Sequence, residues 1–263
     1  MKGGRTVLDG EIIRSYLKED GDVIILDETD STNNVARSLA HRGIKEGTVI
    51  IAKKQTQGRG RMGRSFLSSS ENGLYMTLFL KPEIPPAECI GITVMCACAV
   101  AEAIENISCK KCYIKWVNDI FIGDKKACGI LTEASCDFVS GSFDYAIVGI
   151  GVNVSDPEGG FDEEIKDIAC SVYGKNAPVG IKNRLCAEII NNFMAYYRNF
   201  SDKSYMKNYR RRSNIIGRTV DVYRGNEIIS GICTDIDNEA NLVLQTDKGE
   251  VRFNSGDARV RRV

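Results

Sequence analysis

The sequence has 263 residues, of which 43% are hydrophobic and 27% are charged, and its 35 basic side chains balance its 35 acidic ones. This length is enough for one substantial core with a smaller attached domain. A net charge of zero argues against a general nucleic-acid or anionic-membrane surface, because such surfaces need an excess of Lys and Arg.

The first half of the chain alternates helix-like and strand-like segments. Apolar side chains at helical spacing predict a helix over 9–19. Ser31 or Thr32 is expected to begin the next helix, which ends at His41. Buried strands are expected at 22–28, 47–54, 73–81 and 113–117, and a long apolar helix at 87–107.

The second half continues this alternation and then changes character. A tight hairpin is expected over 118–126, followed by strands at 128–134 and 144–154 and helices near 162–173, 180–199 and 201–212. From Asn214 onward, short alternating strands separated by Gly, Asp and Asn predict a small β-barrel or sandwich. The interpretation is an α+β protein with three parts: an N-terminal helical segment (1–21), a main domain (22–213) and a C-terminal β domain (214–263).

Histidine and cysteine usage narrows the chemistry. His41 is the single histidine, which argues against Ser-His-Asp triads, Cys-His pairs and multi-histidine metal centres. The opening residues lack the apolar core of a signal peptide, and no stretch is expected to provide the ~20 apolar residues of a membrane span. The ten cysteines are therefore expected to be reduced thiols in a cytoplasmic protein. Cys109 and Cys112 have metal-knuckle spacing without a second such pair, so a structural zinc site is the weaker alternative.

The segment GRGRMGRS (58–65) fits two phosphate-binding templates. Both the dinucleotide-binding and the P-loop templates require a helix directly after the glycines, and here a polar turn and another strand follow. The glycines would still let the backbone approach a ligand, and Arg59, Arg61 and Arg64 concentrate positive charge. We interpret the segment as an anion-binding loop, with a solvated basic loop as the alternative.

Four further segments place polar residues at the ends of expected strands. Each has an ordinary structural explanation as well: a helix cap, a surface turn, a strand edge or a strand-ending turn. The segments are DSTNN (30–34), KWVND (115–119), KKACGILTE (125–133) and GIGVN (149–153).

In this order, the five segments resemble the motifs of the biotin–protein ligases. DSTNN is similar to the family's S-T-N motif, QTQGRGRMGR to its G-R-G-R-x-G-R loop, and KWVND to its K-W-P-N-D. KKACGILTE and GIGVN resemble K-x-x-G-I-L-x-E and G-I-G-x-N, and the C-terminal part resembles the family's SH3-like domain more weakly. Val117 stands where the family usually has proline. Bifunctional members carry an N-terminal DNA-binding domain of about 60 residues, so the 21 residues before the first expected strand suggest the monofunctional type.

This resemblance implies both a fold and a reaction. The fold would be a mixed β-sheet flanked by helices, like the class II aminoacyl-tRNA synthetases and the biotin–lipoate ligases, with a small SH3-like barrel at 214–263. Segment 22–213 would then be the catalytic domain that binds biotin and ATP. The reaction would activate biotin with ATP to biotinyl-5′-AMP and transfer biotin to a lysine of a carboxylase's biotin-carrier domain.

The resemblance also assigns residues. Arg61, Lys126 and Asp119 would be catalytic, with Mg²⁺ expected alongside ATP near Asp119 and no residue assigned as a firm metal ligand. Biotin would be held by Ser31, Thr32, Asn33, Gln55, Gly58, Arg59, Gly60, Arg61, Lys126 and Gly129. ATP would be held by Arg59, Arg61, Arg64, Lys115, Asn118, Asp119 and Asn153. The adenine contacts, in the region 160–175, are left unassigned.

Two alternative functions stay open at this stage. A lipoate–protein ligase would share the fold and the chemistry, and a biotin-responsive DNA-binding repressor would belong to a different class. The expected partner is the biotin-carrier domain, with neither nucleic acid nor membrane, and the protein is expected to be a monomer or a homodimer. The native acceptor and the role of Asp119, on ATP and Mg²⁺ or on the incoming lysine, are not determined by the sequence.

Overall fold

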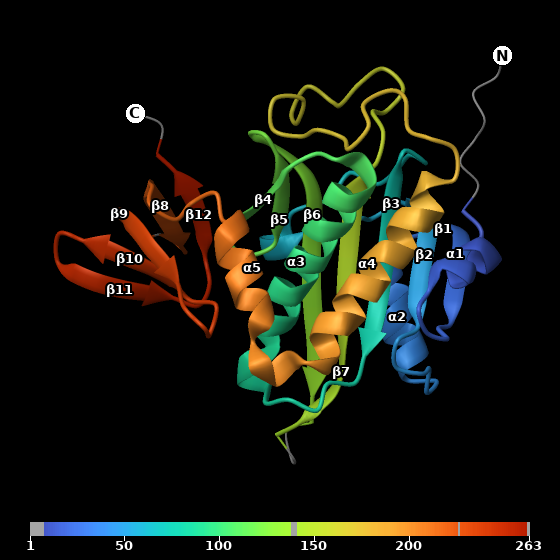
Figure 1. Ribbon diagram of the computed structural model, residues 1–263, viewed down its shortest axis with the longest axis horizontal. Coiled ribbons are helices and arrows are strands. Elements are labelled where there is room, and N and C mark those ends of the chain that lie inside the picture. Colours follow the sequence, from blue (N-terminus) through green and yellow to red (C-terminus); the bar gives the residue numbers. More distant parts are fainter. Residues whose placement is uncertain (1–7, 138–140, 226, 262–263) are drawn as a thin grey trace.

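The computed structural model describes residues 8–137, 141–225 and 227–261 (Figure 1). Its helices are α1 (Gly10–Tyr16), α2 (Thr32–Ala40), α3 (Cys89–Ser108), α4 (Ile181–Arg198) and α5 (Ser204–Arg212). The strands of the first half are β1 (Val23–Thr29), β2 (Val49–Gln55), β3 (Gly73–Leu80), β4 (Cys112–Lys115), β5 (Asp119–Ile122), β6 (Lys125–Cys136) and β7 (Phe143–Asn153). Those of the C-terminal part are β8 (Thr219–Arg224), β9 (Glu227–Ile236), β10 (Leu242–Thr246), β11 (Gly249–Phe253) and β12 (Asp257–Val260).

The first seven strands form one mixed sheet in the order β1-β2-β3-β7-β6-β5-β4. Strands β1 and β2 are parallel and are joined by α2, whereas the remaining neighbours are antiparallel. Central strand β3 (GLYMTLFL) is buried along its whole length. A strand that is covered on both faces is expected to read as a continuous apolar run, and this one does.

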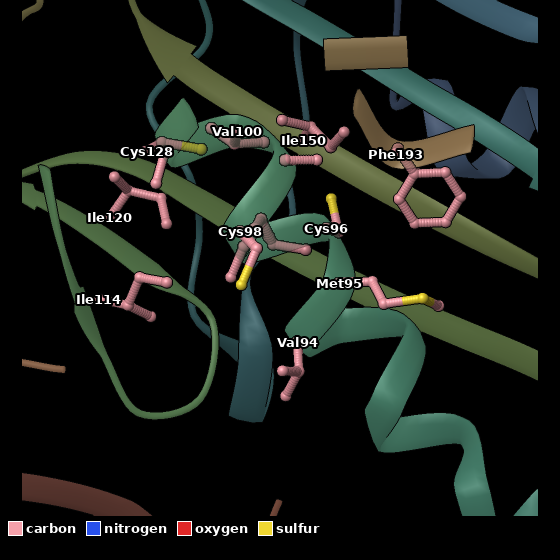
Figure 2. Packing of buried hydrophobic residues seen from close by; sticks show 14 of the residues in the cluster. Val94, Met95, Cys96, Cys98, Val100, Ile114, Ile120, Cys128, Ile150 and Phe193 are labelled. Atoms are coloured by element: carbon pink, nitrogen blue, oxygen red, sulfur yellow. The ribbon is translucent and has the colours of Figure 1, made fainter. Parts of the chain in front are cut away.

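One face of the sheet packs against α3 and α4, which cross in front of it in Figure 1. Thirteen of the twenty α3 residues are buried, among them Cys96 and Val100, which belong to the same core cluster as Cys128 and Ile150 of the sheet (Figure 2). The apolar side chains of β3, β6 and β7 that point to this face complete the main core. A helix enclosed between a sheet and a second helix is apolar on every side.

Helix α3 differs from the sequence-based expectation about membrane spans. Pro86–Ser108 is long and apolar enough to cross a membrane, with a mean hydropathy of 1.8, although no such stretch was expected. However, 72% of its apolar window is buried inside the protein. Enclosure in the core therefore accounts for its composition.

The opposite face of the sheet is covered only in part, by α2. A smaller core joins Ala36 of α2 to Ile50, Phe79 and Ile147 of the sheet. Beyond the N-terminus of α2, this face carries glycines and polar side chains together with Leu131. The uncovered half of the face is where the candidate site lies.

The C-terminal strands form a separate five-stranded antiparallel sheet in the order β11-β10-β9-β8-β12. It lies beside α5 at one edge of the molecule (Figure 1). Hydrogen bonds attach it to the first domain; among them, Trp116 Nε1 donates to Ala240 O at 2.9 Å, and Arg210 Nε donates to Ile236 O at 2.6 Å. The expected α+β class, with a small β domain at the C-terminus, is thus confirmed.

The expected helix at 162–173 was wrong. Residues 163–168 form turns, and Ala169 forms a bridge with Lys126: Lys126 N donates to Ile168 O, and Cys170 N donates to Lys126 O. A helix would have kept these groups for its own hydrogen bonds. The segment therefore lies against the start of β6 as an extended edge.

Candidate active site

The parallel pair β1 and β2 places two of the polar segments at the same sheet edge. The residues after β1 begin α2, and the residues after β2 lead into GRGRMGRS. Gln55, the last residue of β2, joins the two segments through its Oε1, which accepts from Thr32 N at 2.8 Å and from Thr32 Oγ1 at 3.1 Å. Ser31 occupies the N-cap position of α2, but its hydroxyl makes no capping bond within the described part of the chain.

Three glycines from neighbouring strands form the floor of the site. Gly129 of β6 pairs with Gly151 of β7, and Leu131 pairs with Gly149. A Cβ at Gly149 would lie 2.3 Å from Asn33 Oδ1, and a Cβ at Gly151 would lie 2.5 Å from the Phe66 ring. Both distances are shorter than any normal contact. These positions therefore have to be glycine for Asn33 and Phe66 to rest on the sheet.

Residues 58–66 form a short hairpin rather than an extended flexible segment. Gly60 N donates to Arg64 O, Phe66 N donates to Gly58 O, and Arg59 pairs with Ser65. The turn at the tip requires left-handed backbone at Met62 (φ 57°) and Gly63 (φ 72°). The second of these positions explains one of the three glycines of the motif.

The three arginines of this hairpin, which the sequence predicted to act together, point to three different partners. Arg61 Nη1 donates to Asn118 Oδ1 at 3.1 Å. Arg59 turns to the side of α2, where its Nη2 lies 3.2 Å from Glu133 Oε1. Arg64 reaches the C-terminal sheet, with its Nη2 3.0 Å from Asp257 Oδ2.

Lys126 and Asp119 meet on the hairpin formed by β5 and β6, where Lys126 Nζ lies 2.7 Å from Asp119 Oδ1. The backbone of Lys126 is held by the extended edge at 168–170 described above. Asn118 is fixed in turn because its Nδ2 donates to Ile130 O at 2.7 Å. A guanidinium, an ammonium, an amide and a carboxylate therefore converge at one end of the site.

Asp257 of β12 brings the C-terminal sheet into the same site. Its carboxylate lies 3.1 Å from Lys115 Nζ and is also paired with Arg64 and Arg259. Burial acts to raise the pKa of the Asp257 carboxyl, but the charge of Lys115 and hydrogen bonds from Arg64, Lys115 and Arg259 lower it to about 2. The two domains are joined here by charged side chains that stay ionised at neutral pH.

Together these elements enclose a cleft with about 920 Å³ of empty space, part of which is open solvent. One end carries hydroxyl and amide groups, and the other carries the cationic groups around Asp119. Of the predicted site residues, the following line it: Ser31, Thr32, Asn33, Gln55, Arg59, Gly60, Arg61, Arg64, Lys115, Asn118, Asp119, Lys126 and Gly129.

Two predicted residues are not among those that line the cleft. Gly58 lies beneath the hairpin, where a Cβ would be 2.2 Å from Ser68 Oγ and 2.4 Å from Phe66 O. Asn153 ends β7, and its Nδ2 donates to Cys170 O at 3.1 Å, so its side chain fixes the segment after β7. Both residues therefore support the residues that line the cleft and do not line it themselves.

Sequence reasoning missed several residues of the site. Gly149 and Gly151 stand inside the quoted GIGVN segment, and their alternation on a strand could have revealed a shared face. Glu133 is the last residue of the KKACGILTE segment, but the sequence assigned it no role. Thr77 and Asp257 had no signal. Thr77 lies within an apolar strand, where its Oγ1 is 2.7 Å from both Thr32 Oγ1 and Asn33 Oδ1. Asp257 is distant in the sequence from the other residues of the site.

Cys109 and Cys112 belong to no cluster of metal-ligating side chains in the described part of the chain. All ten cysteines are free, and residues 8–137, 141–225 and 227–261 contain no group of three or more His, Cys, Asp or Glu side chains that could hold a metal ion. Cys109 is exposed and ends α3 in left-handed backbone, whereas Cys112 is buried. Burial raises the pKa of the Cys112 thiol to about 12, which disfavours the thiolate that a metal needs.

Comparison with known proteins agrees with this geometry. Residues 25–153 match the model of the Biotin/lipoate A/B protein ligase family, and residues 215–261 match that of the Biotin protein ligase C terminal domain. The Bifunctional ligase/repressor BirA of Bacillus subtilis is 33% identical over 238 residues, which cover 89% of this chain and 73% of that protein. The chain belongs to the biotin protein ligase family. It is therefore an ATP-dependent ligase.

Other members of the family support the same conclusion. The Biotin--[acetyl-CoA-carboxylase] ligase of Mycobacterium tuberculosis is 27% identical, over 89% of this chain and 86% of that protein. The biotin protein ligase of Aquifex aeolicus in complex with biotin and ATP superimposes with a TM-score of 0.75 at 28% identity, covering 92% of this chain and 99% of that chain. At the position where the family has proline, the Trp116–Val117 peptide of this chain is cis.

Proposed function

We propose that this member of the biotin protein ligase family attaches biotin to a lysine of a biotin-carrier domain in two steps. In the first step, a carboxylate oxygen of biotin attacks the α-phosphorus of ATP, forming biotinyl-5′-AMP and releasing pyrophosphate. In the second, the acceptor lysine amine attacks the acyl carbon, loses a proton and releases AMP. The observation that carries the proposal is the cleft itself, with a hydroxyl and amide end and a cationic end on one glycine floor.

The hydroxyl and amide end suits the ureido ring of biotin. A ureido group presents one carbonyl acceptor and two N–H donors, and it needs complementary groups in a buried site. Ser31, Thr32 and Asn33 are each only 3% exposed, and they line the cleft together with Gln55. Their partners within the protein, Thr77 and Glu133, fix the directions in which these groups point.

The cationic end suits the carboxylate and the α-phosphate. These two anions repel each other as they approach, so fixed positive charge between them lowers the barrier. Arg61 and Lys126 line this end together with Asn118 and Asp119. Positioning and charge are sufficient for this chemistry, which is consistent with a single histidine that lies outside the cleft.

Asp119 is the residue that fits the Mg²⁺ ion accompanying ATP. Carboxylate oxygens are the ligands that Mg²⁺ prefers, and the Asp119 carboxylate lines the cleft with Lys126 Nζ 2.7 Å from its Oδ1. When bound, the ion would neutralise phosphate charge. In the second step the same carboxylate can accept a hydrogen bond from the incoming lysine ammonium.

One assay tests the proposal. The protein is incubated with ATP, Mg²⁺, labelled biotin and a biotin-carrier domain, and in parallel with labelled lipoate and a lipoyl domain. Label on the carrier lysine, dependent on ATP, is the expected result. Labelling of the lipoyl domain alone would instead assign the protein to lipoate transfer, and no transfer to either domain would contradict an acyl-transfer function.

A further inference from the structure

The carboxylate of Glu133, which is not one of the expected catalytic residues, connects three segments of the site. Glu133 of β6 is 22% exposed, and its Oε1 lies 3.2 Å from Arg59 Nη2 and 3.0 Å from Arg37 Nη2. Its Oε2 accepts from Asn33 Nδ2 at 2.8 Å. Asn34 strengthens the connection, because its Oδ1 accepts from Arg37 Nη1 at 2.9 Å and from Arg59 Nη1 at 3.3 Å. The GRGRMGRS hairpin is thereby tied to the start of α2.

The side chain of Asn33 depends on this connection for its orientation. Its Oδ1 accepts from Thr77 Oγ1 at 2.7 Å, and its Nδ2 donates to Glu133. These two bonds distinguish the oxygen from the nitrogen, and the missing Cβ of Gly149 leaves room for the amide. Without Glu133, Asn33 Nδ2 would keep only its longer contact to Leu131 O at 3.5 Å, which fixes the rotation of the amide less tightly.

We propose that Glu133 is a positioning residue that latches the GRGRMGRS hairpin through Arg59 and at the same time sets the orientation of Asn33. This inference rests on the proposed function, since it names residues that would prepare the biotin end of the cleft. Arg59 is then an anchor of the hairpin, and Arg61 is the arginine of the hairpin that is left to meet the carboxylate and phosphate.

The reason lies in the backbone of the hairpin. A glycine-rich segment has many accessible conformations, and each residue that a ligand must order lowers its affinity. The pairs Arg59–Glu133 and Arg64–Asp257 tie the two arms of the hairpin to β6 and to β12, which leaves fewer residues for a ligand to order. The tip with Arg61 is thus presented from a hairpin whose arms are anchored and joined by backbone hydrogen bonds.

Protease protection tests the latch without using activity. Trypsin cleaves after arginine, so native-state cleavage after Arg61 reports opening of the hairpin, and cleavage after Lys111 serves as an internal control. In Glu133→Ala, cleavage after Arg61 should rise about three- to fivefold, the change that an ion pair of this exposure can supply. Glu133→Gln, which keeps an acceptor, should lie between this variant and wild type.

Two matched variants separate the latch from a general loss of stability. Arg37→Met removes a contact of Glu133 that does not involve the hairpin, and its cleavage after Arg61 should match wild type. The double variant Arg59→Met/Glu133→Ala should open no more than Arg59→Met alone, because the two residues act as one unit. Additive opening in the double variant, or an equal rise after Lys111, would overturn the proposal.

Biotin binding provides a second test that does not depend on proteolysis. Glu133→Ala should weaken biotin binding by calorimetry, while pyrophosphate exchange at saturating biotin stays within about twofold of wild type. Unchanged biotin affinity would contradict the role at Asn33. If wild type proves protected after Arg61 but transfers no biotin, the proposed function fails while the latch stands.

Discussion

Lys126 Nζ lies 2.7 Å from Asp119 Oδ1 across the β5–β6 hairpin, at the cationic end of the cleft. The ammonium is about one-third exposed, so replacing it should have little effect on stability. In the proposed reaction, its charge would meet the carboxylate of biotin and the α-phosphate of ATP. A substitution of Lys126 should therefore change the activity much more than the stability.

We therefore predict that Lys126→Ala lowers biotin-dependent ATP–pyrophosphate exchange by about 10²-fold or more while the unfolding midpoint shifts little. Lys125→Ala is the matched control, because its Nζ donates to Lys166 O outside the cleft. That variant should keep wild-type exchange. Normal exchange in Lys126→Ala would remove this lysine from the mechanism.

A second prediction concerns retention of the adenylate. Arg61 is at the tip of the hairpin and donates to Asn118 at 3.1 Å. A charge-assisted contact to the carboxylate or phosphate contributes about 1.5–3 kcal/mol, so Arg61→Gly should release biotinyl-5′-AMP about ten- to a hundredfold faster. Rapid filtration of the labelled adenylate measures the rate, and Arg61→Lys should retain part of the effect. Wild-type retention in Arg61→Gly would contradict this role for the hairpin.

Most of the residues that line the cleft could be predicted because the five motifs resemble those of a known family. The structure adds the reason why DSTNN and GRGRMGRS meet: they follow β1 and β2, which are parallel neighbours in the sheet. The separate destinations of Arg59 and Arg64 could not be predicted, since they depend on Glu133 and Asp257, which contact them only in the folded protein.

The wrong helix at 162–173 has a similar origin. Its acidic and apolar residues have helical spacing, but the edge of the sheet at Lys126 offers the backbone of Ile168 and Cys170 other partners. Local preference is weak compared with tertiary contacts over such a short segment. Val117 is a second example. The motif comparison showed only that this chain lacks the usual proline, and it did not predict that the Trp116–Val117 peptide is cis.

Acid should loosen the contact between the domains, and Asp257 supplies a third prediction. Because its pKa in the folded protein is about 2, below the ordinary value of 3.8, its contribution is present above pH 4 and is lost as pH falls toward 2. The shift corresponds to about 2 kcal/mol. In urea unfolding, Asp257→Asn should be less stable than wild type at pH 6, and the difference should shrink toward pH 2. If the stability difference between Asp257→Asn and wild type stayed the same from pH 6 to pH 2, ionisation of this carboxyl would not be its cause.

Metal content supplies a fourth prediction. Because the described residues provide no cluster of metal ligands around Cys109 and Cys112, the purified protein should contain no stoichiometric zinc by atomic emission. A chelator should inhibit the reaction only until Mg²⁺ is restored, and Cys109→Ser should be as active as wild type. Zinc at one equivalent per chain, lost in Cys109→Ser, would establish the knuckle instead.

The glycine floor leads to the fifth prediction. A Cβ at Gly149 would lie 2.3 Å from Asn33 Oδ1, so Gly149→Ala must push the amide away from Thr77 and Glu133. Overpacking of this kind costs about 1–3 kcal/mol, and the displaced amide should weaken biotin binding by about ten- to a hundredfold. Calorimetry measures the affinity, and urea unfolding shows how much of the effect is global. Gly10→Ala, which meets only ordinary contacts with Arg14 far from the cleft, is the control and should bind biotin as wild type does. If Gly149→Ala also bound biotin normally, Asn33 would not be a biotin ligand, because the variant cannot keep that amide in place.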